Sequence, residues 1–341
     1  MKHDYRWMRA ALALAERGLG RTQPNPSVGC VIVKDGVVLG RGWTQPGGRP
    51  HAEAMALAQA GALAQAGEAA RDATVYVTLE PCAHESPRGP SCTSLLLAAR
   101  PARVVIAALD PDPRTSGHGA LALQRAGIEV VSGVLEAEAV RQQRGFRLRL
   151  AEGRPEVTLK LATSLDGRIA LPNGESRWIT GPEARRHAHL ERARHDVILI
   201  GRRTLETDDP MLDVRLPGLE DRSPRPVVVS RTLERIAPSL KLAGRAEVLS
   251  GASLPEMLAG LAAGGALRVL AEGGAGLAAS LLRHDLVDRL LWYTAPIVLG
   301  DGRSGVEDLG LARLAEAHGR WRTVDSLALG EVRLAVFERI R

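Results

Sequence analysis

The stretch TVYVTLEPCAH, residues 74–84, decides the fold of the first half of this chain. Its apolar opening predicts a buried strand at residues 74–79, and a Pro-Cys pair follows where that strand ends. Further helices and strands alternate around it, and we expect them from residue 51 and at 93–99, 103–109, 119–126 and 128–132. Such alternation predicts parallel crossovers, and therefore a layered α/β domain.

The residues before this stretch predict an antiparallel edge for the same sheet. A helical pattern at residues 4–18 comes first, with Asp4 as a cap. Strand-like runs at 28–34 and 37–41 then flank Asp35-Gly36, a dipeptide that favours the tight turns of hairpins.

Four residues near the ends of these elements suggest metal chemistry. His51 and Glu53 open a helix directly after the loop PGGRP, so both side chains project from its first turn, whereas Cys82 follows a strand and Cys92 precedes the next helix. One imidazole and two thiolates form the incomplete tetrahedral set of a catalytic zinc, which keeps a position for water and lowers the pKa of that water to about 7. Glu53 is then suited to carry the proton from the water to a leaving amine.

The order of these residues matches the signature of zinc-dependent nucleobase deaminases, in which His-x-Glu is followed by Pro-Cys-x-x-Cys. In this chain nine residues, and not two, separate Cys82 from Cys92. A non-catalytic zinc module, in which both cysteines only hold structure, remains an alternative. A structural site needs a fourth protein ligand, so finding His84 on the metal would favour that alternative.

Composition limits the classes of function. A chain of 341 residues suits two domains, and its three cysteines argue against a disulfide framework, with Cys30 expected in the core. The net charge of +6 comes from scattered arginines without a clustered stripe, so we expect small phosphorylated anions as partners and no nucleic acid. The alternative is that an Ala- and Arg-rich composition only reflects genomic base bias. No apolar stretch reaches the roughly 18 residues of a membrane helix, and no signal peptide is evident, so we expect no membrane partner and a cytoplasmic enzyme.

A charged helical stretch ending in EGRP, residues 152–155, predicts the domain boundary. We expect a first domain at 1–147, a linker at 148–154 and a second domain at 155–341. In the second domain we expect strands at 157–162, 196–201, 227–230, 267–272 and 290–295, helices at 182–194 and 275–283, and a closing pair of strands between 326 and 340.

One turn of the second domain suggests a nucleotide. The sequence EGGAG, residues 272–276, ends a strand and opens a helix, where backbone N–H groups can receive a pyrophosphate. The run GAGLAA also matches the Rossmann pattern G-x-G-x-x-A, but no acidic residue ends a strand about 20 positions later, which opposes a Rossmann fold.

Motifs along nearly the whole chain resemble those of the bifunctional deaminase/reductases of riboflavin biosynthesis. They are PNPSVG (24–29), PHAE (50–53), LEPCAH (79–84), DPDP (110–113), KLATSLDGR (160–168), GESRWIT (174–180) and TDDP (207–210). The resemblance implies an N-terminal cytidine-deaminase-like three-layer domain and a C-terminal dihydrofolate-reductase-like α/β domain, with Zn²⁺ and NADPH as cofactors. It identifies His51, Cys82 and Cys92 as zinc ligands and Glu53 as the proton shuttle.

The resemblance also implies the reaction. The first domain would hydrolytically deaminate 2,5-diamino-6-ribosylamino-4(3H)-pyrimidinone 5′-phosphate. The second would reduce the ribosyl group to ribityl with NADPH, giving 5-amino-6-ribitylaminouracil 5′-phosphate. By the same resemblance Asn25 and His84 contact the pyrimidine. The loop 83–91 is one residue longer than is usual in the family, which leaves open whether Arg88 is the basic residue that contacts substrate.

In the second domain the resemblance implies two sets of binding residues. The positions expected at the cofactor are Ala162, Trp178, Thr204, Asp208, Ser230, Gly274, Ala275, Gly276, Leu277, Ala278, Ala279 and Ser280. Those expected at the substrate are Lys160, Ser176, Arg192, Leu212, Arg215 and Glu272. The two arginines suit a phosphate, because their forked donors pair with its oxygens. Lys160 and Asp208 are candidates for assisting proton movement, although TDDP also fits a simple turn.

A rival interpretation is a single-function nucleoside or tRNA deaminase whose second domain only binds a partner. The Gly-rich turn and the long matching second half oppose it. We also expect a homo-oligomer, either a dimer or a tetramer.

Overall fold

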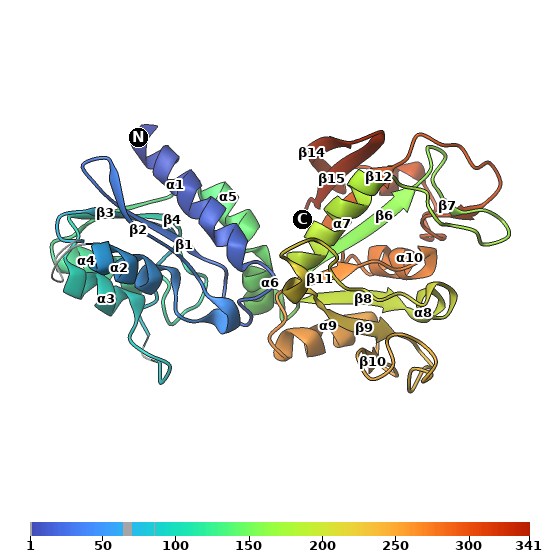
Figure 1. The fold of residues 1–341 in the computed structure, drawn as a ribbon, viewed down its shortest axis with the longest axis horizontal. Helices are drawn as coiled ribbons and strands as arrows, with labels where there is room; N and C mark the ends of the chain where they lie inside the picture. Colours follow the sequence, from blue (N-terminus) through green and yellow to red (C-terminus); the bar gives the residue numbers. More distant parts are fainter. Residues whose placement is uncertain (1, 64–69, 85) are drawn as a thin grey trace. The chain divides into compact units, whose positions relative to one another are not determined.

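The chain folds into two compact units in the computed structural model, Met1–Glu152 and Gly153–Arg341 (Figure 1). The structure describes residues 2–63, 70–84 and 86–341. The first unit has the deaminase-like layered fold and the second the α/β fold that the sequence predicts. Among the described residues no helix is both long and apolar enough to cross a membrane.

The first unit is built on a five-stranded sheet with the order β2-β1-β3-β4-β5. Its strands are β1 Gly29–Lys34, β2 Val37–Trp43, β3 Thr74–Leu79, β4 Arg103–Ala108 and β5 Glu129–Ser132. β1 pairs antiparallel with β2 and with β3, whereas β3, β4 and β5 run parallel. The predicted hairpin and the predicted parallel crossovers are both present.

Helices cover the two faces of this sheet and make it the middle of three layers (Figure 1). The helices are α1 Lys2–Ala15, α2 Ala52–Leu63, α3 Cys92–Ala99, α4 His118–Arg125, α5 Glu136–Gln142 and α6 Arg144–Glu152. Met8 and Ala11 of α1 pack with Ala139 of α5 against Val31 and Tyr76 of the sheet. On the opposite face lie α2, α3 and α4.

Helix α2 lies directly on β2 because the strand carries glycine where the two elements touch. A Cβ at Gly42 would overlap the carbonyl oxygen of Ala52, and a Cβ at Gly40 would overlap that of Ala56. The helix presents small alanines to the strand, so the two backbones come close. This contact fixes the height of the first turn of α2 above the sheet.

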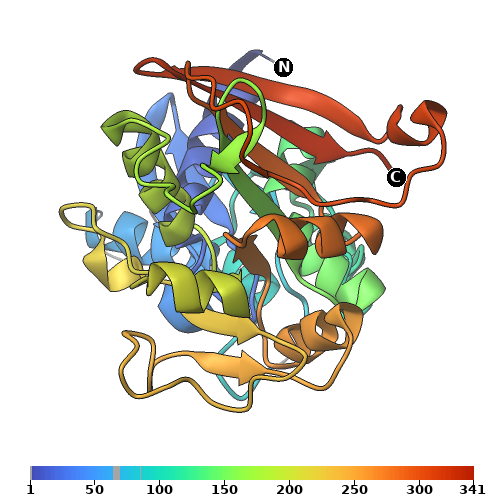
Figure 2. The same ribbon diagram turned by 90° about the vertical axis from the view of Figure 1, so that its right-hand side faces the viewer.

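The second unit has an eight-stranded sheet with the order β10-β9-β8-β11-β6-β12-β15-β14 (Figure 2). Its strands are β6 Glu156–Thr163, β8 Val197–Gly201, β9 Arg225–Val229, β10 Glu247–Leu249, β11 Arg268–Ala271, β12 Arg289–Thr294, β14 Trp321–Leu329 and β15 Val332–Arg339. β7 Arg168–Ala170 and β13 Arg303–Ser304 form a separate pair. The helices are α7 Pro182–Ala193, α8 Arg202–Asp208, α9 Leu254–Ala263 and α10 Ala275–Arg283.

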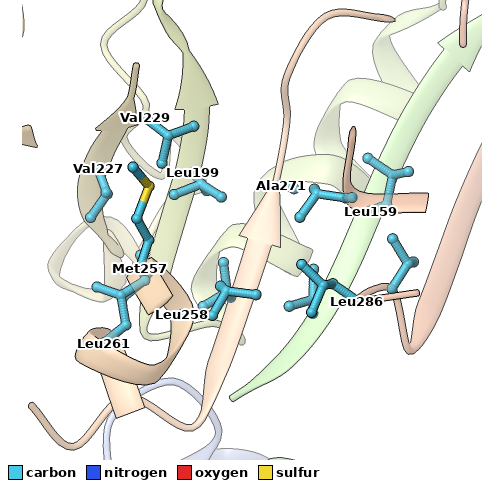
Figure 3. Packing of buried hydrophobic residues seen from close by; sticks show 14 of the residues in the cluster. Leu159, Leu199, Val227, Val229, Met257, Leu258, Leu261, Ala271 and Leu286 are labelled. Carbon is cyan, nitrogen blue, oxygen red and sulfur yellow. The ribbon is translucent and has the colours of Figure 1, made fainter. Parts of the chain in front are cut away.

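Buried apolar side chains of the central strands point alternately to the two faces of this sheet, so each face has its own hydrophobic core. Leu199, Val227 and Ala271 face Met257 and Leu258 of α9 in one cluster (Figure 3). The intervening residues, such as Ile198, Val228 and Leu270, pack with Leu205 of α8 on the other face. Since side chains alternate along a strand, Lys160 of β6 faces away from the cluster that holds Leu159 and Leu161.

Candidate active sites

Three side chains converge in the first unit as potential metal ligands. The ligand atoms of His51, Cys82 and Cys92 lie within 4.8 Å of one another. His51 Nδ1 lies 3.3 Å from Cys92 Sγ and 3.6 Å from Cys82 Sγ. A tetrahedral zinc, with Zn–S near 2.3 Å and Zn–N near 2.0 Å, separates its nitrogen and sulfur ligands by about 3.5 Å. The residues present therefore fit zinc.

The docking of α3 on the end of β3 brings the two cysteines together. Ser91 caps α3 by accepting a hydrogen bond from Ser94 N at 3.1 Å. The Cys92 N–H donates to Cys82 Sγ at 3.3 Å. The hydroxyl of Thr93 donates to Pro81 O at 3.1 Å. These bonds explain why nine intervening residues do not separate the ligands.

The electrostatics of this cluster favour a thiolate. Hydrogen bonding from Cys92 lowers the pKa of Cys82, against the effect of burial, and His51 adds to the lowering. Zinc binds thiolates and not thiols, so this shift favours metal binding. Cys30 lies in β1 with no exposed surface, and burial raises the pKa of its thiol, so it is a core residue as predicted.

Glu53 lies beside the ligands without being one of the cluster. Its side chain is buried, 3% exposed, and burial raises its pKa. His84 is not part of the cluster either, and its Nδ1 instead lies 3.3 Å from Thr115 Oγ1. Within the part of the chain that is described, the cluster thus offers three protein ligands, which is the number expected of a catalytic zinc.

A cavity of about 200 Å³ opens beside these residues. Both predicted pyrimidine contacts, Asn25 and His84, line it together with His51 and Glu53. The amide nitrogen of Asn25 donates to Gly48 O at 2.8 Å and lies 3.2 Å from His51 Nε2. The turn that begins α2 therefore holds Asn25 at the edge of the cavity.

Two arginines connect the loops that border this cavity. Arg88 Nη2 donates to Gly47 O at 2.8 Å, and Arg49 Nη1 donates to Pro90 O at 3.5 Å. Each of the two loops thus donates an arginine hydrogen bond to a carbonyl of the other loop, and both arginines line the cavity. Sequence reasoning left Arg88 open and did not identify Arg49, although it immediately precedes the PHAE motif.

Cavities of about 660, 450 and 430 Å³ lie side by side in the second unit, where Thr204 borders each of them. Ser230 and the beginning of α10 line the largest, where the predicted residues are Gly274, Ala275, Gly276, Leu277 and Ser280. Ala278 and Ala279 are buried in the core and do not line it. Thr204 Oγ1 accepts a hydrogen bond from Gly274 N at 3.2 Å.

The remaining predicted residues surround the 450 Å³ cavity. They are Lys160, Ala162, Ser176, Trp178, Arg192, Asp208, Leu212, Arg215 and Glu272. Burial raises the pKa of Asp208, against the charges of Arg177 and Arg303. The same cavity has further basic side chains that the sequence did not single out, namely Arg177, Arg185, His189 and Lys241.

A largely buried group of charges lines this cavity. Arg192 binds both carboxylate oxygens of Glu272, at 2.7 and 2.9 Å, and its Nη1 donates to Asp213 O at 2.9 Å. Burial alone would raise the pKa of Glu272, but Arg192 and then Lys160 lower it to about 2. Burial also lowers the pKa of Lys160, whose ammonium lies 5.6 Å from the ring centre of Tyr293.

Family comparisons agree with this division into two sites. Residues 1–108 match the cytidine and deoxycytidylate deaminase zinc-binding region, and residues 155–334 match the RibD C-terminal domain. The riboflavin biosynthesis protein RibD of Escherichia coli (strain K12) is 39% identical over 354 residues, covering 93% of this chain and 94% of that protein. RibD of Aquifex aeolicus (strain VF5) is 38% identical over 361 residues and 98% of both chains.

The fold of this chain is also similar to solved structures. Acinetobacter baumannii RibD, form 1, superimposes with a TM-score of 0.89 at 35% identity, over 100% of this chain and 99% of that one. The diaminohydroxyphosphoribosylaminopyrimidine deaminase/5-amino-6-(5-phosphoribosylamino)uracil reductase of Thermotoga maritima gives a TM-score of 0.88 at 31% identity over 99% of both. The chain therefore belongs to the RibD family, the bifunctional enzymes of riboflavin biosynthesis that join a zinc-binding deaminase domain to an NADPH-dependent reductase domain.

Proposed function

We propose that the first unit hydrolytically deaminates 2,5-diamino-6-ribosylamino-4(3H)-pyrimidinone 5′-phosphate. The second unit then reduces the ribosyl group of the product to ribityl with NADPH, giving 5-amino-6-ribitylaminouracil 5′-phosphate. The observation that carries this proposal is the convergence of His51, Cys82 and Cys92 at a cavity that Glu53 lines together with His51 and Cys82. We assign residues 1–147 to the deaminase, 155–341 to the reductase and 148–154 to the segment between them.

In the deaminase, His51, Cys82 and Cys92 hold zinc, which when bound makes water nucleophilic at neutral pH. Glu53 receives a proton from the attacking water and delivers it to the departing amine. Its carboxylate is buried in the cavity wall, which keeps that proton away from bulk solvent. Asn25 and His84 bind the edges of the pyrimidine, since an amide and an imidazole together offer donors and acceptors.

In the reductase, NADPH supplies hydride. The backbone at the start of α10, from Gly274 to Gly276, receives the pyrophosphate, because the N–H groups of a helix's first turn attract anions; the N–H of Gly274 itself donates to Thr204 Oγ1. Ser230 and Thr204 line the same cavity and complete this part of the site. Ala162, Trp178 and Asp208 border the cofactor in the neighbouring cavity.

The sugar phosphate binds in the 450 Å³ cavity beside Ser176 and Leu212, and Arg215 is the principal phosphate ligand. The side chain of Arg215 is 61% exposed, and its guanidinium, which lies 3.5 Å from Asp213 Oδ1, can turn toward an anion. Arg192 instead holds Glu272, with which it shares two hydrogen bonds. Lys160 is positioned to donate a proton to the sugar, because it is half-buried, lines the same cavity and interacts electrostatically with Glu272.

We also propose that the protein forms a homo-oligomer. β14 is the last strand of the eight-stranded order, and Val324 and Leu327 on it are 40% and 37% exposed. A long edge strand of this kind offers a surface for a second copy. Light scattering should give the mass of a dimer or a tetramer, whereas the mass of a single chain would contradict this proposal.

The decisive experiment for the reaction supplies the phosphorylated diaminopyrimidinone to zinc-loaded protein with and without NADPH. We expect ammonia release in both cases. Loss of the nicotinamide absorbance should follow only once deaminated product has formed. Failure of the zinc-loaded protein to release ammonia would exclude the deaminase assignment.

A further inference from the structure

The buried carboxylate of Glu80 fixes a segment that returns to the deaminase cavity. Its Oε2 accepts from Gly117 N at 2.9 Å and from Asp110 N at 3.3 Å, and its Oε1 accepts from Ala120 N at 3.0 Å. Glu80 is 2% exposed, so these bonds form out of contact with water. A buried carboxylate with three amide donors strongly restrains the backbone that supplies them.

Close packing fixes the same segment a second time. A Cβ at Gly119 would overlap Pro81 O, next to the metal ligand Cys82, and would lie 3.0 Å from Thr93 Oγ1. The start of α4 therefore lies directly on the end of β3. Because the segment 110–120 is held at both of these points, its intervening residues have a defined position relative to the metal ligands.

Thr115 lies in the middle of this segment and has no exposed surface. Its N–H donates to Asp112 O at 2.8 Å, and its carbonyl accepts from His118 N at 2.6 Å, so its backbone is held on both sides. Its Oγ1 lies 3.3 Å from Nδ1 of His84. A hydroxyl both donates and accepts, and it can therefore bind either tautomer of the ring.

We propose that Thr115 is a positioning residue of the deaminase, which fixes the ring orientation of His84 through the contact with Nδ1 and so presents Nε2 to the pyrimidine. The proposal rests on the substrate-binding role of His84 proposed above. The χ2 torsion of histidine is broad and two-fold, so a half-exposed ring has two orientations unless a neighbour selects one. Thr115 makes that selection.

One charged pair, Asp112 with Arg114, lies beside this contact, and the carboxylate of Asp112 also interacts electrostatically with His84. Asp112 is the carboxylate nearest in sequence, but its oxygens accept from Arg114 Nε at 3.0 and 3.1 Å. Arg114 thereby holds Asp112, and the hydroxyl of Thr115 lies within hydrogen-bonding distance of His84 Nδ1. LEPCAH thus contains both Glu80, which fixes the distant segment, and His84, which that segment orients.

The test uses the full zinc-loaded chain and the variants Thr115→Val, Thr115→Ser and His84→Ala. Loss of one hydrogen bond of ordinary strength corresponds to roughly 3- to 10-fold in binding. We expect Thr115→Val to raise the KM of deamination by about that factor with little change in kcat. Thr115→Ser keeps the hydroxyl and should restore the wild-type KM.

A double-mutant cycle separates positioning from a purely structural role. In a His84→Ala background, Thr115→Val should cause no further loss, because the ring that it orients is absent. Additive losses, or an unchanged KM in Thr115→Val, would overturn the proposal. Zinc content and reduction of pre-deaminated substrate by the same chain serve as folding controls. Absence of deamination in the wild type would instead contradict the proposed function itself.

Discussion

Arg192 and Glu272 form a forked ion pair, with Nε to Oε1 at 2.7 Å and Nη2 to Oε2 at 2.9 Å. Arg192 was predicted to bind the substrate phosphate, but the fork is directed at a carboxylate of the protein. Because Lys160 lies beside the same carboxylate and shifts its pKa, the pair sets the environment of the proposed proton donor.

Arg192→Lys should therefore lower kcat of the reductase by about 10-fold or more, because an ammonium keeps the charge but loses the fork. Steady-state assays with pre-deaminated substrate check this, and deamination by the same protein should not change. Arg215→Lys is the matched control, and it should mainly raise KM for the phosphorylated substrate. If Arg192→Lys instead raised only KM, Arg192 would be a phosphate ligand as the sequence predicted.

Glu53→Gln should retain zinc and lose deamination by at least about 100-fold, in line with the usual contribution of a general acid–base. An amide of similar shape cannot carry the proton. Ammonia release and metal content are measured on the same sample, and reduction of pre-deaminated substrate should be intact. Loss of both activities in a folded protein would argue against independent sites.

Cys92→Ser should lose zinc and deamination together, since the hydroxyl is a much poorer zinc ligand than a thiolate. Cys30→Ala is the matched control, because Cys30 is equally buried but lies outside the ligand cluster. Metal analysis after dialysis compares the two variants. Equal zinc content in both would show that Cys92 does not hold the metal.

Gly274→Val should raise KM for NADPH with little change in stability. The glycine has extended φ and ψ of −71° and 177°, which valine adopts readily, and the nearest atom to a Cβ there is Thr204 Oγ1 at 3.6 Å. The new side chain would enter the space proposed for the pyrophosphate. Fluorescence titration with NADPH measures the change, and unaltered binding would place the pyrophosphate elsewhere.

The stability of the second unit should fall in acid through His195. Its ring is 1% exposed, and burial followed by the charge of Arg268 lowers its pKa to about 3. Nδ1 lies 2.6 Å from Glu191 O, which only accepts, so the neutral ring donates there and accepts from Thr158 Oγ1 at 3.0 Å. Protonation would reverse that second bond and would place a positive charge in a buried site that already feels the charge of Arg268.

Because the folded pKa is below the unfolded value of about 6.5, this contribution is complete above pH 6.5 and is lost as pH falls toward 3. Between these pH values the free energy of unfolding falls by up to about 1.4 kcal/mol per pH unit for one proton. Hydrogen exchange of β6 and β8 peptides in urea should show this fall in the wild type and a shallower one in His195→Gln. Identical slopes would exclude His195 as the titrating group.

Strong local signals in the sequence predicted much of this fold, and its short or polar elements were missed. β14 begins at Trp321 and not near residue 326, because its mostly exposed side chains give no apolar alternation. β7 and β13 have three and two residues and pair although they lie far apart in the sequence, which no local pattern predicts. α9 was also missed, although Ser253 and Glu256 form a capping box that marks its start.

The metal ligands were predictable because each lies in a short motif with its own chemistry. Residues that reach a site only because a segment distant in sequence folds back to it were not predictable in this way. Thr115 lies 31 positions from His84 and belongs to no motif, so only the return of its segment to β3 reveals the contact. His189 and Lys241 reach the reductase cavity from a helix and a loop that are distant in sequence.

The glycines of β2 have a consequence for how this enzyme tolerates mutation. Gly40 and Gly42 belong neither to the ligand cluster nor to the lining of the deaminase cavity, yet a side chain at either position would push away the end of α2 that bears Glu53. A survey of random variants should therefore find these two positions nearly as intolerant as the zinc ligands. In laboratory evolution toward other aminated heterocycles, we expect more substitutions to be tolerated in the loops around Arg49 and Arg88 than at these two glycines of β2.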